Sequence, residues 1–168
     1  MNLFSNNLLG EFESLSEAFR RHGWRLATAE SCTGGLIAAG LSEIPGASGV
    51  LECGFVTYSN AAKQQLLGVP GGLIASVGAV SAEVAEAMAM GALAHSDADV
   101  AISATGIAGP GGATPDKPVG LVYLGAARRG HPARHERHIF SGDRTAVRLA
   151  TVEAAVALLM RLSDEAAP

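Results

Sequence analysis

The chain has 168 residues, of which 48% are hydrophobic and 17% are charged, and its formal net charge is −4. This length and apolar content suit one domain with its own core and exclude a disordered chain, while the acidic balance argues against binding to nucleic acids or acidic membranes. Two cysteines exclude a disulfide scaffold, and without a signal-like or membrane-spanning apolar run we expect a cytoplasmic protein.

Apolar residues recur either at helical spacing or in short β-rich runs, which predicts alternating helices and strands. In chain order these are a helix over 5–22, a strand over 24–29, a helix from 31 to the proline at 45, a strand over 50–58, a helix over 60–67, a helix from 81, a strand over 99–104, a strand over 119–127, a strand over 135–140 and a helix over 143–162. Gly23 and Gly68 are expected to end two of the helices, and Ser81 to cap another.

Helices interleaved with apolar strands predict an α/β protein, a three-layer α/β/α sandwich with a mixed, mostly parallel sheet. The last strand is expected to pair antiparallel with the one before it, as a hairpin across Arg128-Arg129-Gly130. We expect a single domain over residues 1–168, with an N-terminal helix over 1–23 packed on it and a frayed tail over 164–168.

Three polar segments follow predicted strands: Glu30–Gly35, Tyr58–Asn60 and Thr105–Gly112. Ligands of open α/β sheets bind beyond the carboxyl ends of strands, so we expect these segments to converge there. The first either stabilises an anion or a developing oxyanion at a helix start, or only caps the helix. The third, with four glycines, lets the backbone approach a ligand or is only a connector.

Lys63 is one of only two lysines among twelve basic residues, and it follows the second polar segment. A serine with a desolvated lysine as base is a known route to an activated nucleophile, whereas the alternative is a solvated surface lysine. Arg144 stands at the start of the last helix, where the helix dipole disfavours a cation. It faces either a ligand anion or the neighbouring Asp143.

Other residue types point to fewer possibilities. Cys32 is interpreted as a small core residue and, as a minor alternative, as a nucleophile with a lowered pKa at a helix start. The five histidines show no spacing typical of a metal site. The chain also lacks the Walker A, dinucleotide-binding and G-x-S-x-G motifs. The residues alone therefore predict an α/β domain with a small-anion site.

Six short motifs occur in one order along the chain. They are Ala29-Glu30-Ser31-Cys32-Thr33-Gly34-Gly35, Tyr58-Ser59-Asn60 with Lys63, Gly78-Ala79-Val80-Ser81, Ala104-Thr105-Gly106-Ile107-Ala108-Gly109-Pro110-Gly111-Gly112, Lys117-Pro118-Val119-Gly120 and Gly142-Asp143-Arg144. Together they resemble the CinA C-terminal domain family, whose enzymatic members are the PncC-type nicotinamide mononucleotide deamidases. The resemblance runs from about residue 24 to about residue 163.

The resemblance implies hydrolysis of the primary amide of nicotinamide mononucleotide to nicotinate mononucleotide and ammonia, in pyridine nucleotide recycling. It also implies an α/β/α domain that forms a homodimer and needs no cofactor or metal. Ser31 is then the nucleophile and Lys63 its general base, Tyr58 and Thr105 orient the substrate or relay protons, and Arg144 contacts an anion.

The same resemblance implies two groups of substrate-binding residues. One holds the oxyanion through helix N–H groups near Thr33, Gly34 and Gly35, with Thr105 as a further candidate. The other holds the 5′-phosphate through Arg144 and the glycine loop, that is Gly106, Gly109, Gly111 and Gly112.

The chain departs from the family pattern in two ways. Longer CinA proteins carry an N-terminal domain linked with nucleotide pyrophosphatase activity, for which we expect no room in 168 residues. Position 113 is alanine where the family often continues with glycine. Two other functions stay open: a non-catalytic nucleotide-binding regulatory module of the competence or damage-inducible type, and an amide hydrolase with another substrate. The acidic balance disfavours a DNA-binding role.

Overall fold

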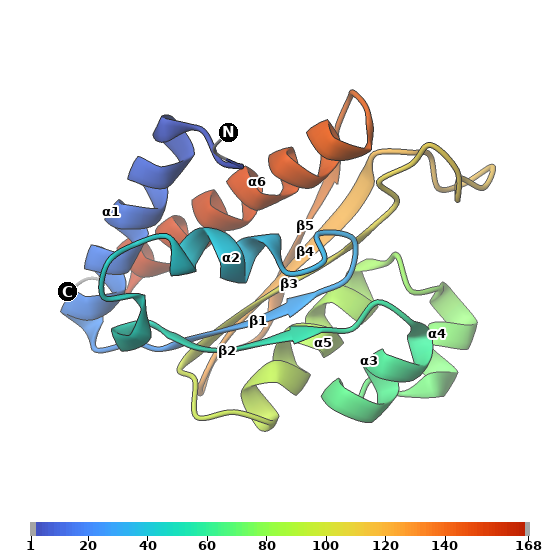
Figure 1. The fold of residues 1–168 in the computed structure, drawn as a ribbon. Coiled ribbons are helices and arrows are strands. Elements are labelled where there is room, and N and C mark those ends of the chain that lie inside the picture. The colour runs from blue at the N-terminus through green and yellow to red at the C-terminus, as the bar shows by residue number, and fades with distance from the viewer. Residues whose placement is uncertain (1–2, 167–168) are drawn as a thin grey trace.

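The computed structural model describes residues 3–166 (Figure 1). In chain order its elements are α1 (Asn6–His22), β1 (Leu26–Glu30), α2 (Leu36–Ser42), a 3-10 turn (Ala47–Gly49), β2 (Leu51–Val56), α3 (Asn60–Leu67), α4 (Gly71–Val77), α5 (Ala82–Ala94), β3 (Val100–Gly106), β4 (Leu121–Arg128), β5 (Arg134–Ile139) and α6 (Arg144–Glu165). None of the described helices is long and apolar enough to cross a membrane.

The five strands form one mixed sheet in the order β2-β1-β3-β4-β5. Strand β1 is parallel to β2 and β3, whereas β4 is antiparallel to both β3 and β5. The α/β class, the mixed and mostly parallel sheet and the antiparallel hairpin are confirmed: β1, β2, β3 and β5 run in one direction and β4 runs in the other. A parallel return needs a long crossover that is usually helical. The β3–β4 connection has no helix, so β4 returns antiparallel.

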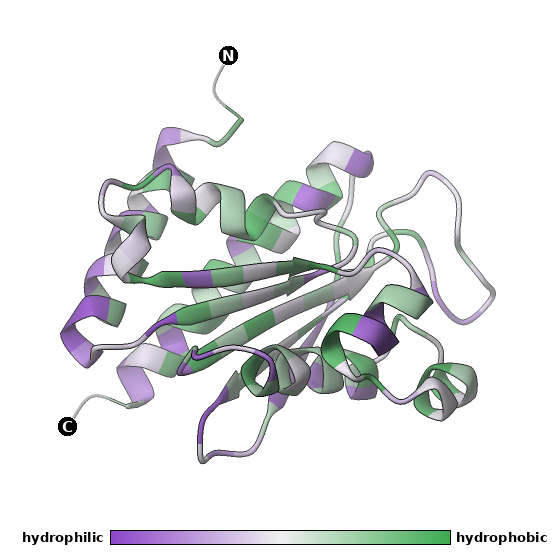
Figure 2. Ribbon diagram, turned by 60° about the horizontal axis from the view of Figure 1, so that its bottom comes forward, coloured by the Kyte–Doolittle hydropathy of each residue, from purple (hydrophilic) through white to green (hydrophobic). Residues whose placement is uncertain are grey.

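Helices cover both faces of the sheet, which confirms the three-layer sandwich. Figure 1 shows α1, α2 and α6 on one face and α3, α4 and α5 on the other. Figure 2 shows hydrophobic residues along the strands between the two layers. Phe12 and Phe19 of α1 are fully buried in the first apolar cluster, and Met88 of α5 is fully buried in the second. The α1 helix therefore contributes to the core on one face of the sheet.

Local sequence signals fix most element ends. Gly23 and Gly68 end α1 and α3 in the left-handed conformation that glycine adopts without a steric penalty. Ser81 and Asp143 accept hydrogen bonds from first-turn N–H groups of α5 and α6, so both cap their helices. The sequence analysis missed α4, a seven-residue helix that begins with Gly71-Gly72, because two glycines give that segment a low helix propensity.

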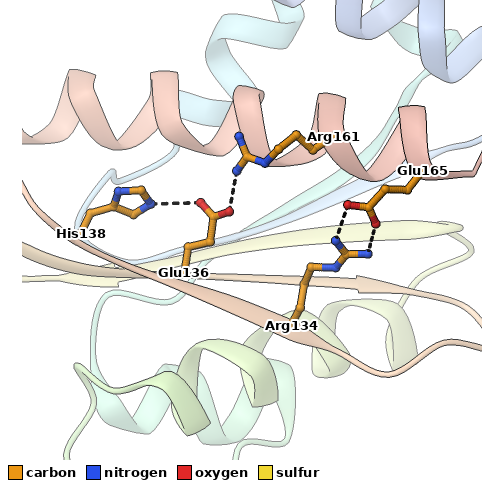
Figure 3. A network of polar contacts seen from close by, with 5 residues as sticks. All are labelled: Arg134, Glu136, His138, Arg161 and Glu165. Carbon is orange, nitrogen blue, oxygen red and sulfur yellow. Dashed lines mark hydrogen bonds and ion pairs between the residues drawn. The ribbon is translucent and has the colours of Figure 1, made fainter.

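The C-terminal end of α6 is held against β5 (Figure 3). Arg134 makes two hydrogen bonds to the Glu165 carboxylate, at 3.0 and 2.7 Å. Glu136 accepts hydrogen bonds from Arg161 and His138. Helix α6 continues to Glu165 and so includes residues 164–165 of the tail for which fraying is predicted. Residues 1–2 and 167–168, at the ends of the expected domain, lie outside the described residues.

Candidate active site

A pocket of about 220 Å³ lies at the carboxyl ends of β1 and β3. Its lining residues are Ser31, Cys32, Tyr58, Asn60, Lys63, Ala79, Val80, Thr105, Gly106, Ala108 and Arg144. All three polar segments predicted to converge contribute to it, so that prediction is confirmed. Within residues 3–166, no group of three His, Cys, Asp or Glu side chains is placed to hold a metal ion.

Ser31 and Lys63 meet at the floor of this pocket. Lys63 lies on α3, which Ser59 caps, and its side chain is only 1% exposed. Lys63 Nζ lies 3.0 Å from Ser31 Oγ and 2.9 Å from the Thr57 carbonyl oxygen. Lys63 is thus a buried residue in contact with Ser31 and not a solvated surface lysine.

Burial makes the amine of Lys63 a candidate base. Burial lowers the pKa of Lys63 below its ordinary value of 10.5, because a charged ammonium loses its hydration there. No carboxylate forms an ion pair with Lys63 in the described chain to offset this loss. A neutral amine donates one N–H to Thr57 and turns its lone pair toward the Ser31 hydroxyl. The contact is thus arranged for proton transfer from Ser31 to Lys63.

Glu30 fills the start of α2 with its own carboxylate. This side chain is fully buried, and it accepts hydrogen bonds from Thr33 Oγ1 at 2.6 Å and from Gly35 N at 3.1 Å. It also accepts from the backbone N–H groups of residues 37 and 38, each at 3.0 Å. The start of α2, which attracts an anion, is therefore already occupied by the carboxylate of Glu30. The sequence analysis listed Glu30 in a motif but gave it no role.

Two of the three expected oxyanion donors are therefore already engaged. Gly34 N donates to the Ser31 carbonyl at 3.0 Å, and Gly35 N donates to Glu30. Thr33, Gly34 and Gly35 do not line the pocket. A substrate-binding role for Thr33, Gly34 and Gly35 stays a prediction, with acceptors at Ser31 and Glu30 competing for two of their three N–H groups.

Cys32 offers a different N–H group. In the part of the chain that the structure describes, the Cys32 N–H donates to no protein acceptor. The C=O and N–H of a trans peptide point in opposite directions. Because the Ser31 carbonyl accepts a hydrogen bond from Gly34 N, the Cys32 N–H of the same peptide points away from Gly34, and Cys32 lines the pocket. The thiol itself is buried, which raises its pKa to about 11, so the alternative of a Cys32 nucleophile is not supported.

Arg148 is a second residue that the sequence analysis did not assign. It lies one turn after Arg144 on α6, and its guanidinium reaches the turn that carries Ser31. Arg148 Nε donates to the Cys32 carbonyl at 3.2 Å and Nη2 to the Thr33 carbonyl at 2.9 Å. These two hydrogen bonds from one guanidinium hold the Cys32 and Thr33 carbonyls in place, next to the predicted nucleophile Ser31. The available signal was its spacing of four residues from Arg144, which places both arginines on one helix face.

Tyr58 and Arg144 form the rim of the pocket. Arg144 Nη2 donates to the Tyr58 hydroxyl at 2.6 Å, and Nη1 donates to the Gly109 carbonyl at 2.9 Å. The Tyr58 oxygen acts as an acceptor in this contact, so its own hydrogen remains available to a ligand. Asp143 accepts from the Ala146 N–H at 2.8 Å. It therefore caps α6 and leaves Arg144 free to face the site.

Thr105 is 1% exposed and lies on the pocket wall. Its Oγ1 donates to the Ala79 carbonyl at 2.8 Å. A hydroxyl has one hydrogen only, so Thr105 has none left for an oxyanion. A role of Thr105 in oxyanion binding would therefore require its hydroxyl to turn away from Ala79.

The glycine loop is only partly in the pocket. Gly106 lines it and Gly109 contacts Arg144, whereas Gly111 and Gly112 are exposed beyond the lining. Among the described residues, none of the backbone N–H groups of Ala108, Gly109 and residues 111–113 donates to a protein acceptor, and Pro110 has no N–H group. These free N–H groups near Arg144 can bind an anion.

Comparison with known proteins gives consistent similarities. A model of the CinA C-terminal domain matches residues 11–163. The nicotinamide-nucleotide amidohydrolase PncC of Pseudomonas putida is 51% identical over 151 residues, which cover 90% of this chain and 94% of that protein. A CinA-like protein of Akkermansia muciniphila is 52% identical over 136 residues, or 81% of this chain. The match covers 33% of that longer protein, so the chain spans about a third of its length.

Solved structures agree with the sequence comparisons. The crystal structure of the competence/damage inducible protein CihA from Agrobacterium tumefaciens has a TM-score of 0.93 and 45% identity, over 96% of this chain and 99% of that one. A CinA superfamily protein from Klebsiella pneumoniae has a TM-score of 0.91 and 35% identity, over 95% of this chain and 99% of that one. Both likenesses extend over the whole sandwich, pocket included.

Proposed function

The chain belongs to the CinA C-terminal domain family, and on that basis we propose that it hydrolyses the primary amide of nicotinamide mononucleotide to nicotinate mononucleotide and ammonia. The observation that carries the proposal is the 3.0 Å contact between Ser31 Oγ and the buried Nζ of Lys63. A protein that only binds nucleotides needs neither a nucleophile nor a base. The P. putida relative, which bears the amidohydrolase name, covers nearly the same length.

Acylation begins when neutral Lys63 takes the Ser31 proton. Ser31 Oγ then attacks the carboxamide carbon, forming a C–O bond while the carbonyl electrons move to its oxygen. Lys63, now protonated, gives its proton to the amide nitrogen as the C–N bond breaks, and ammonia leaves. Water then attacks the acyl-enzyme, with Lys63 accepting its proton and returning one to Ser31 Oγ. The products are the free serine, the free lysine and the nicotinate carboxylate with one released proton.

The developing oxyanion needs hydrogen-bond donors in the pocket. We assign this role to the Cys32 N–H, which follows the nucleophile directly and has no acceptor in the described chain, and to the Tyr58 hydroxyl. Arg144 donates to the Tyr58 oxygen at 2.6 Å, which polarises the hydroxyl and strengthens it as a donor. Preorganised donors of this kind typically contribute about 10²- to 10³-fold each in kcat.

The 5′-phosphate is assigned to the other end of the pocket. Arg144 is the one arginine of the lining, and its guanidinium has N–H groups beyond those that bind Tyr58 and Gly109. The free N–H groups of Ala108, Gly109 and residues 111–113 belong to the loop whose Gly109 carbonyl accepts a hydrogen bond from Arg144. Guanidinium and backbone N–H groups together suit a phosphate. Gly111 and Gly112 act in this proposal through the loop backbone.

Three broader expectations belong to the same proposal. They are a single domain over residues 1–168, a homodimer in solution and a role in pyridine nucleotide recycling in the cytoplasm. The two edges of the sheet differ in a way that supports dimerisation. Strand β5 is lined with charged residues, a common protection against edge pairing, whereas β2 ends in the half-exposed Phe55 and the 50% exposed Val56. Light scattering of the purified protein measures the oligomeric state directly.

The test is ammonia release from nicotinamide mononucleotide by the purified protein, with EDTA present and Ser31→Ala as the control. Release that disappears in Ser31→Ala is the expected result. Saturable binding of the mononucleotide without release would support a nucleotide-binding regulatory module instead. Release of ammonia from free nicotinamide or glutamine, but not from the mononucleotide, would identify an amidase with another substrate.

A further inference from the structure

Thr105 lies beside Ser31 on the neighbouring strand. At the ends of β1 and β3, Glu30 pairs with Ala104, and Ser31 N donates to the Ala104 carbonyl at 2.9 Å. Alternate residues of a strand point to opposite faces. Ser103 of β3 donates to a carbonyl of α5, so Thr105, two residues on, points to the same helical layer. That layer also supplies Lys63, so the serine, the threonine and the lysine surround one point of the pocket.

The Thr105 hydroxyl can only accept a hydrogen bond from a ligand. Its single hydrogen goes to the Ala79 carbonyl, 2.8 Å away, because a carbonyl oxygen has no hydrogen of its own to donate. Only lone pairs of Oγ1 remain for the pocket. A buried acceptor of this kind is costly when no donor meets it.

The segment just before the Ala79 carbonyl is held in place by two hydrogen bonds. Ser81 Oγ donates to the Gly78 carbonyl at 2.8 Å while capping α5. Lys117 Nζ, from the β3–β4 loop, donates to the Val77 carbonyl at 2.7 Å. The segment between α4 and α5 therefore fixes the direction of the Thr105 hydroxyl hydrogen, away from Ser31.

We propose that Thr105 Oγ1 accepts a hydrogen bond from the NH2 group of the substrate carboxamide, and that Thr105 thereby selects primary amides. The inference rests on the proposed function, since it assigns the partner of the leaving group. The carboxamide carbon must lie within reach of Ser31 Oγ, which brings its nitrogen next to the neighbouring Thr105. The amide NH2 group supplies a hydrogen-bond donor for the lone pairs of Thr105 Oγ1.

The same contact becomes stronger during the reaction. When Lys63 protonates the departing nitrogen, that nitrogen becomes cationic and its N–H groups become better donors. The bond to Thr105 Oγ1 is then tighter in the transition state than in the bound substrate, which is the condition for accelerating the chemical step. Thr105 acts here as a catalytic residue, because it touches the reacting group.

An ester in place of the amide could not donate this hydrogen bond to Thr105. The alkoxy oxygen of a methyl ester carries lone pairs and no hydrogen, so it meets the Thr105 lone pairs without a hydrogen bond. Sites built to bind an N–H group discriminate strongly against analogues that lack it. The wild-type protein is therefore expected to favour the amide over the ester, although esters are the more reactive acyl compounds.

The experiment compares kcat/KM for nicotinamide mononucleotide and for the methyl ester of nicotinate mononucleotide in three proteins. In Thr105→Val the amide reaction should fall about 10- to 100-fold, as expected for loss of a charge-assisted hydrogen bond, while the ester reaction changes by less than about threefold. Thr105→Ser keeps the hydroxyl and should keep the wild-type amide-to-ester ratio. Thr105→Ala removes the same hydroxyl and replaces Thr105→Val should that variant fail to fold.

Ser103→Ala is the matched control, because Ser103 is a buried hydroxyl on the same strand that also donates to a carbonyl, at 2.5 Å, but lies outside the pocket. Its amide-to-ester ratio should equal that of the wild type. Equal losses of both reactions in Thr105→Val would overturn the inference and leave the proposed function standing. An absence of ammonia release by the wild-type protein would overturn the proposed function and the inference together.

Discussion

Replacing Lys63 by methionine should abolish ammonia release and also remove a pH dependence of folding stability. Methionine fills much of the volume of the lysine stem without its amine. The 1% exposed amine meets only Ser31 and the Thr57 carbonyl, and burial lowers its pKa below 10.5. Between the folded pKa and 10.5, the unfolded chain therefore binds a proton that the folded protein does not. In that range the free energy of unfolding rises with pH.

The size of this slope follows from proton linkage. One proton bound by the unfolded state alone corresponds to about 1.4 kcal/mol per pH unit, which is the upper limit for Lys63. The measurement stays below pH 9.0, the ordinary pKa of cysteine, because burial raises the pKa of Cys32 to about 11. Above 9.0 the unfolded chain loses a thiol proton that the folded protein keeps, so Cys32 makes stability fall with pH.

The assay is urea unfolding at several pH values from about 7 to about 8.5, followed by tryptophan fluorescence. Trp24 is the single tryptophan and packs edge-on against Phe19 at 5.5 Å, so it reports on the fold. Lys63→Met should lose the lysine contribution to the slope. Lys117→Met, the matched change at the other lysine, should keep the wild-type pH slope of the free energy of unfolding. If the wild-type slope persists in Lys63→Met, the pKa of Lys63 in the folded protein lies above this pH range, which would contradict a neutral resting amine.

Three further predictions concern the residues around Ser31 and Lys63. Glu30→Gln should lower the free energy of unfolding by about 2 to 4 kcal/mol in urea titrations, because an amide cannot accept all four hydrogen bonds; an unchanged midpoint would contradict this. Arg148→Ala should lower kcat about 10- to 100-fold with little change in KM, because the turn that carries Ser31 loses its two hydrogen bonds from the guanidinium. A change in KM alone would assign Arg148 to binding. Tyr58→Phe should lower kcat by about 10²-fold by removing an oxyanion donor, and an unchanged kcat would exclude that role.

The sequence alone determined the local structure and the chain order of the polar segments. Gly23, Gly68, Ser81 and Asp143 each act within one turn of their own position, so their effects are readable without knowing the fold. The apolar runs between them indicated the α/β class. Because polar residues followed these runs, the sequence also indicated that they gather at the carboxyl edge of the sheet.

The tertiary structure decided which of these groups are free to act. From the sequence, Lys63 could be solvated or buried, and only the packing of α3 against α5 brings its amine against Ser31. The helix start after Ser31 looked open to a ligand, but Glu30 reaches it through a side-chain direction that no spacing reveals. Hydrogen bonds between residues far apart in the chain depend on rotamers and on strand direction, which the whole fold sets. For the same reason, Thr105 became an acceptor only through the carbonyl of Ala79, 26 residues away.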